Sequence, residues 1–151
     1  MLLALAFAAA PPRFDPLRFF AGRTEGTARL HIAFHHPRNV RVHGRGRLAP
    51  DGALVLEQRV EQQGSPPRTR NWRIREVAPG RYTGTLTDAT GPVTGEARGD
   101  TFALRYKAQG GVTIRQRLVL APDGRAAGNR LTARKLGIVV ARLDETIRKA
   151  D

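Results

Sequence analysis

The histidines of this sequence could bind a metal ion, because imidazole is a common ligand of zinc and copper. The four histidines are His31, His35, His36 and His43. His31 and His35 are four residues apart, which in a strand corresponds to about 13 Å and is too far for two ligands of one ion. His35 and His43 could meet only across a hairpin. We therefore expect no metal site, and we interpret these residues as polar surface side chains around the His36-Pro37 turn.

Nucleophilic catalysis has little support in the sequence. Ser65 is the only serine, it lies in a Gly-Ser-Pro-Pro loop with no histidine nearby, and cysteine is absent. No HExxH, GxSxG or glycine-rich phosphate-binding motif is present. We therefore predict a protein that is not an enzyme and has no cofactor. The alternative, an enzyme, would require an ordered pocket that joins polar residues such as Glu57, Arg70, Asp88 or Lys135.

Three polar residues fall on strand faces that are otherwise apolar. Gln58, Arg70 and Asp88 each follow the alternation of neighbouring apolar residues, so their side chains are expected to point inward. Buried charges persist when they are paired and hydrogen-bonded. Arg70 and Asp88 are therefore either a structural pair or part of a site for a ligand headgroup. Together with two aromatic residues of the same apolar parity, they give the candidate ligand-binding set: Arg70, Trp72, Asp88, Gln58 and Tyr106.

The elements that must position these residues are β-strands. Alternation of apolar and polar residues runs from Gly22 almost to the C-terminus, and 16 glycines and 10 prolines without a periodic repeat supply turns. We count about ten strands at the spacing typical of barrels and sandwiches, the first of them extending from Gly22 to His35 with Phe34 on its apolar face. Closure would remove both unpaired edges. The prediction is an all-β, antiparallel, up-and-down lipocalin-like barrel of about eight to ten strands over residues 13–151, whose interior holds side chains or one small ligand.

Four glycines interrupt the apolar face of the predicted strands: Gly44, Gly46, Gly84 and Gly95. A glycine inside a strand permits sharp coiling at a barrel corner, or it leaves space inside the barrel. Both interpretations remain open from the sequence.

Residues 1–12 form a separate apolar segment, MLLALAFAAA followed by two prolines. The segment is about half as long as a membrane-spanning helix, and it contains A-x-A patterns like those at signal-peptide cleavage sites. We interpret it as a truncated signal peptide, with an apolar helix docked on the barrel as the alternative. The expected location is the periplasm or cell envelope. No cysteine follows the segment, so the chain as written is not expected to be lipid-anchored.

The formal net charge of +13 predicts an affinity for polyanions. The basic residues are dispersed along the chain, however, and the aromatic residues share the apolar parity instead of lying among the arginines on an exposed face. We therefore do not expect nucleic acid as a partner. Anionic lipid or lipopolysaccharide is the polyanion that an envelope protein would meet.

Several short motifs, taken in order, resemble a bacterial family known as domain of unknown function 3833. The motifs are Phe20-Ala21-Gly22-Arg23-Thr24-Glu25-Gly26, Arg70-Asn71-Trp72-Arg73-Ile74, Tyr82-Thr83-Gly84 with Asp88 and Gly91, and the segment Asn129 to Ile138. The resemblance covers Phe14 to about Ile147. It implies a lipocalin-like barrel in the cell envelope and no established activity.

These observations give two hypotheses about function. The first is an exported, non-enzymatic lipocalin-like barrel that binds a small amphipathic or lipid-like ligand. The alternative is an envelope protein with a filled barrel that contacts anionic lipid or lipopolysaccharide through its basic surface.

Overall fold

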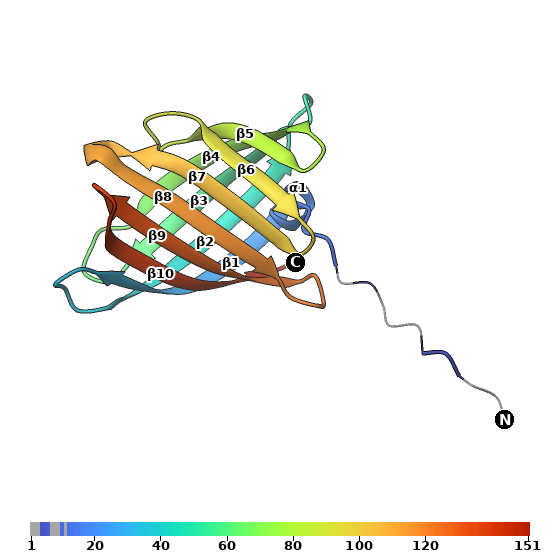
Figure 1. Cartoon of the computed structure of the whole chain (residues 1–151), viewed down its shortest axis with the longest axis horizontal. Coiled ribbons are helices and arrows are strands. Elements are labelled where there is room, and N and C mark those ends of the chain that lie inside the picture. The colour runs from blue at the N-terminus through green and yellow to red at the C-terminus, as the bar shows by residue number, and fades with distance from the viewer. Residues whose placement is uncertain (1–3, 7–9, 11) are drawn as a thin grey trace.

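The computed structural model describes residues 4–6, 10 and 12–151 as a ten-stranded barrel with one short helix (Figure 1). The elements are α1 (Pro16–Phe19), β1 (Gly22–Ile32), β2 (Arg38–Leu48), β3 (Leu54–Gln62), β4 (Arg68–Ala78), β5 (Arg81–Leu86), β6 (Val93–Arg98), β7 (Thr101–Ala108), β8 (Val112–Leu120), β9 (Ala126–Lys135) and β10 (Ile138–Lys149), with a 3-10 turn at Gln109–Gly111 between β7 and β8.

Each strand pairs antiparallel with its neighbours in the chain, and pairing between β1 and β10 closes the barrel. The closing register runs from Thr24 opposite Lys149 to Ile32 opposite Ala141. Closure leaves no unpaired strand edge, which is the physical reason for expecting it. The predicted all-β, antiparallel, lipocalin-like barrel is thus confirmed.

The first strand ends earlier than the alternation of residues suggests. Phe34 was expected on the apolar face of a strand reaching His35, but β1 ends at Ile32. Phe34 has a φ of 66° and its side chain is fully exposed. The tight connection to β2 requires a left-handed residue at this position, so Phe34 belongs to the turn. The period-two pattern continues into the turn only by chance.

The suggested meeting of His35 and His43 across the hairpin is also wrong. The register places His43 opposite Glu25 in the barrel wall, while His35 lies in the turn. On the outer face, His43 Nδ1 is 2.5 Å from Glu25 and Nε2 is 3.1 Å from Glu61. The part of the chain that the structure describes contains no cluster of three or more His, Cys, Asp or Glu side chains suited to a metal.

One end of the barrel is closed by α1. The Asp15 carboxylate caps the helix by accepting hydrogen bonds from the backbone N–H groups of Leu17 and Arg18. At the other end of the helix, Lys149 Nζ donates to the carbonyl oxygens of Phe19 (2.7 Å) and Ala21 (2.9 Å). The last strand therefore holds the helix in the barrel end through a charged donor.

An aromatic core lies directly inside this closed end. Phe14 packs against Phe102 with ring centroids 5.8 Å apart, and Tyr82 meets Phe102 edge-on at 5.4 Å. All three residues are buried. This half of the barrel interior is filled by the chain's own side chains.

The glycines on the apolar face accommodate other parts of the chain. A Cβ at Gly46 would overlap the carbonyl oxygen of Phe20, so this glycine lets β2 approach the end of α1. At the other three positions a Cβ would crowd Thr24, the backbone of Arg73 or the ring of Phe102. The room these glycines provide inside the barrel is taken by the chain's own atoms.

The described part of the N-terminal segment forms no helix. Residues 4–6 and 10 are exposed and have no regular structure, whereas residues 1–3, 7–9 and 11 of the predicted signal peptide lie outside the described residues. Within the described ranges, no helix has the length and apolar character needed to cross a membrane.

Candidate functional site

A cavity of about 240 Å³ lies inside the barrel, and its lining residues place it next to the open end, which is the end away from α1. The connections at this end are the turns β1–β2, β3–β4, β5–β6, β7–β8 and β9–β10. Its walls are largely aliphatic, and the apolar lining residues include Leu30, Val40, Val42, Val60, Ile114, Leu131 and Leu143. These residues point inward because each occupies the inner parity of its strand.

A layer of polar side chains crosses the barrel between this cavity and the aromatic core. Arg70, Gln116, Asn129 and Glu145 line the cavity, and they also line a much smaller space of about 40 Å³ on the side of α1. The polar layer is therefore the floor of the open cavity. The four residues come from β4, β8, β9 and β10.

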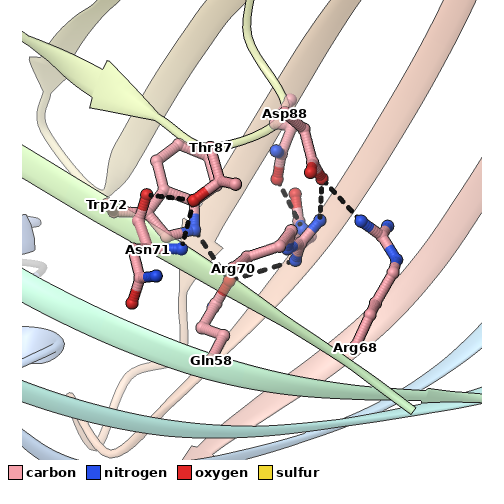
Figure 2. Close-up of polar contacts among 9 residues, drawn as sticks. Gln58, Arg68, Arg70, Asn71, Trp72, Thr87 and Asp88 are labelled. Carbon is pink, nitrogen blue, oxygen red and sulfur yellow. Dashed lines mark hydrogen bonds and ion pairs between the residues drawn. The ribbon is translucent and has the colours of Figure 1, made fainter.

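Gln58 is the centre of one half of the layer, as Figure 2 shows. Its Oε1 accepts a hydrogen bond from Trp72 Nε1 at 2.7 Å and another from Arg70 Nη2 at 3.0 Å. Strands β3 and β4 place Gln58 directly opposite Arg70. One buried amide oxygen thus fixes both the indole ring and the guanidinium group.

Arg70 is largely buried, with its side chain 16% exposed, and it lies 6.0 Å above the Trp72 ring. Burial lowers the pKa of Arg70, but a guanidinium group keeps its proton in proteins. A buried positive charge is therefore present on the floor of the cavity.

Asp88 lies at the mouth of the cavity, in the connection between β5 and β6. Its carboxylate is 2.8 Å from Arg68 Nη1 and 4.0 Å from Arg70 Nη1 (Figure 2). The expected Arg70–Asp88 contact is present, but the closer partner is Arg68, which has the same parity and lies two residues nearer the open end. Asp88 is therefore shared between two guanidinium groups, and Glu145 is the other acid whose charge acts on Arg70.

The other half of the polar layer is built on Asn129. Its Nδ2 donates to Gln116 Oε1 and to Glu145 Oε1, each at 3.0 Å. A Cβ at Gly26 would overlap the Glu145 carboxylate, so this glycine makes room for the acid. Burial raises the pKa of Glu145, while the Asn129 hydrogen bond and the Arg70 charge oppose that shift.

Two buried polar atoms of the layer have no hydrogen-bond partner within the described chain: Arg70 Nε, a donor, and Asn129 Oδ1, an acceptor. Unsatisfied buried polar atoms are uncommon in folded proteins and call for a reason. Tyr106 is also buried beside the cavity; burial raises the pKa of its phenol, so the hydroxyl remains protonated at neutral pH. The floor therefore offers a donor and an acceptor beneath an aliphatic wall.

The structure brings the five sequence-predicted site residues to one region of the interior. Gln58, Arg70 and Trp72 form the hydrogen-bonded group, and Tyr106 and Asp88 line the open cavity. By contrast, Glu57 and Lys135, which were named with Arg70 and Asp88 as residues whose joint pocket would favour an enzyme, are exposed and do not line the cavity.

Sequence reasoning did not identify Gln116, Asn129, Glu145 or Arg68. A signal was available, because Gln116 shares the parity of Ile114 and Leu118, and Arg68 that of Arg70. Only the strand register shows that Gln116, Asn129 and Glu145 lie in one layer.

The fold and its polar interior define a lipocalin-like barrel. The chain belongs to the family described as Protein of unknown function (DUF3833), whose family model matches residues 4–149. No curated protein matches the sequence.

Two solved structures are similar in fold. One is the S-type phycobiliprotein lyase CPES from Guillardia theta, with a TM-score of 0.71, 7% identity, and coverage of 89% of this chain and 90% of that chain. The other is a protein of unknown function from the DUF3598 family of Nostoc punctiforme PCC 73102, with a TM-score of 0.69 and 12% identity. That match covers 97% of this chain and 53% of the other, so this chain spans about half of that protein. At these identities the likeness concerns the fold alone.

Proposed function

We propose that the protein binds a small amphipathic molecule in the cavity at the open end of the barrel. The observation that carries the proposal is the unsatisfied buried donor Arg70 Nε on a polar floor below aliphatic walls. A ligand with a polar head and an apolar body would match both surfaces. Its head would accept a hydrogen bond from Arg70 Nε.

The charge of the floor favours an acidic head. Arg70 is cationic and lies only at the outer limit of an ion pair with Asp88, whose closer partner is Arg68. Burial raises the pKa of Glu145, the other acid whose charge acts on Arg70. A carboxylate or a similar anionic head would supply the charge partner that a buried arginine requires. We therefore infer a carboxylic acid with an apolar chain as the ligand class.

The cavity limits how much of this ligand is enclosed. Its volume of about 240 Å³ lies just below the roughly 300 Å³ at which pockets for small molecules begin. A short acyl chain fits inside, and the far end of a longer chain would emerge between the turns of the open end. The aromatic core on the side of α1 blocks deeper entry.

The proposal is tested with decanoic acid by isothermal titration calorimetry, with 1-decanol as the uncharged comparison. We expect saturable 1:1 binding of the acid, weaker binding of the alcohol, and at least about tenfold weaker binding of the acid to Arg70→Met, since a hydrogen bond to a charged group is worth about 1.5–3 kcal/mol. Arg75→Met is the matched control, because Arg75 lies on the same strand but is exposed. Absence of saturable binding, or equal affinity in Arg70→Met and Arg75→Met, would refute the proposal.

We further propose that the protein acts as a binder that leaves its ligand chemically unchanged, and that it is exported to the periplasm or envelope. The apolar residues 1–10 with their A-x-A patterns support export. Mass spectrometry of decanoic acid recovered after incubation should show an unaltered mass. Fractionation of cells that express the full chain should place the protein in the periplasmic or envelope fraction; a cytoplasmic location would refute export.

A further inference from the structure

Three large apolar side chains are exposed around the open end of the barrel, and all three belong to two neighbouring hairpins. Phe34 is fully exposed in the β1–β2 turn, Leu136 is 92% exposed in the β9–β10 turn, and Ile138 next to it is 69% exposed. β1 pairs with β10, and Ala33 N–H donates to the carbonyl of Val140 at 2.9 Å, so the two hairpins are linked. Both turns lie at the end away from α1 (Figure 1).

The backbone at these positions does not favour the residues that occupy them. Phe34 and Leu136 have φ values of 66° and 51°, in the left-handed region that glycine and asparagine prefer. Lys135 pairs with Ile138, so Leu136 and Gly137 form a two-residue hairpin loop with positive φ at both positions, for which Asn-Gly is the favoured sequence. Folding does not account for an exposed leucine and phenylalanine there.

The surroundings of these apolar tips are basic. Residues 30–40 and 132–143 contain no Asp or Glu, and they contain Arg38, Arg134, Lys135 and Arg142 together with His31, His35 and His36. Lys135 and Arg142 are exposed. Two acidic residues lie at this end of the barrel: Asp88 is bonded to Arg68, and Glu61, near the end of β3, contacts His43 and Arg59. Apolar side chains that project from a cationic rim are complementary to a membrane surface that has anionic headgroups above an apolar interior.

We propose that the two hairpin tips, defined by Phe34, Leu136 and Ile138, dock the open end of the barrel onto a bilayer that contains anionic phospholipid. The apolar side chains enter the boundary between headgroups and acyl chains, and the basic residues lie against the headgroup phosphates. Docking in this orientation turns the mouth of the cavity toward the lipid. The docking surface itself does not depend on the cavity having a ligand.

The test is co-sedimentation of the full chain with vesicles of phosphatidylcholine alone or with 30 mol% phosphatidylglycerol. We expect binding to the anionic vesicles and at least about fivefold weaker binding to neutral ones. Binding to the anionic vesicles should fall strongly at 1 M salt, where the screening length for electrostatic attraction is about 3 Å. The double variant Phe34→Asn/Leu136→Asn should bind at least about tenfold more weakly, since it removes two large apolar side chains. Asparagine suits the left-handed backbone, so the variant should fold at least as well as the wild type.

The matched control is Leu48→Asn/Val77→Asn, which removes two apolar side chains, each 54% exposed, outside the two hairpins. This control should bind anionic vesicles like the wild type. Equal loss in both double variants, unchanged binding by Phe34→Asn/Leu136→Asn, or no binding by the wild type would overturn the proposal. Concentration-dependent self-association that this variant abolishes, without vesicle binding, would assign the tips to a second copy of the chain and also overturn it.

Failure of docking and failure of ligand binding can be told apart. The titration with decanoic acid is done without vesicles, and Phe34 and Leu136 do not line the cavity. The double variant should therefore retain wild-type affinity for decanoic acid in solution while it loses vesicle binding.

Discussion

Replacement of Gln58 by leucine tests whether the polar layer is held by a single amide oxygen. Leucine has nearly the same volume but cannot accept the hydrogen bonds from Trp72 Nε1 and Arg70 Nη2. Trp72 is buried, so its indole N–H would remain without a partner, at a cost of about 1–3 kcal/mol. Arg70 keeps Asp88 within 4.0 Å, so its loss is about 1 kcal/mol. The expected destabilisation is about 2–4 kcal/mol.

The measurement is urea unfolding followed by far-ultraviolet circular dichroism, for the wild type, Gln58→Leu, Trp72→Phe and the double variant. Because Trp72→Phe removes the indole donor, Gln58→Leu should cost about 1–2 kcal/mol less in that background. Gln109→Leu, at an exposed position in the β7–β8 turn, is the control and should change the free energy of unfolding by less than about 0.5 kcal/mol. A cost below about 0.5 kcal/mol for Gln58→Leu, or no coupling with Trp72→Phe, would refute the role of the amide oxygen.

Three further predictions concern other parts of the barrel. Burial raises the pKa of Glu145 in the folded state, so its contribution to stability is fully present below the unfolded pKa and is lost as pH rises through the folded pKa. Glu145→Gln should therefore raise the melting temperature more at pH 7.5 than at pH 4. A larger increase in melting temperature at pH 4 would contradict this prediction. Lys149→Met removes the donor to the carbonyls of Phe19 and Ala21 and should lower the free energy of unfolding by about 1–3 kcal/mol. Lys107→Met, at an exposed position, should not lower it. Equal effects of the two variants in urea titrations would show that the helix needs no charged cap. Leu136→Asn alone should keep or raise the melting temperature measured by calorimetry, because asparagine suits the left-handed turn position, and a clear drop would argue that Leu136 supports the fold.

The barrel was predictable from the sequence because period-two alternation and regularly spaced turns are local properties. The same alternation failed at Phe34, where one more apolar residue of the right parity belongs to a turn whose backbone only the three-dimensional connection determines. Pairing of β1 with β10 joins residues more than a hundred positions apart, and it was expected only from the general cost of open edges.

The candidate site was predictable in part. Inward parity identified Gln58 and Arg70 correctly as interior residues, and it placed Asp88 near the same region although Asp88 follows the end of β5. Gln116, Asn129 and Glu145 also have inward parity, yet each is a single polar residue on its own strand. Only the register across β8, β9 and β10 shows that they form one layer and that Gly26 makes room for the acid.

The central claim, that the open cavity binds an amphipathic acid through Arg70, is tested most directly by native mass spectrometry of the full chain with decanoic acid. We predict one bound molecule per chain in the wild type and in Arg75→Met, and a largely bare mass for Arg70→Met under the same conditions. A bare wild-type mass at saturating acid, or equal occupancy in Arg70→Met, would contradict the claim.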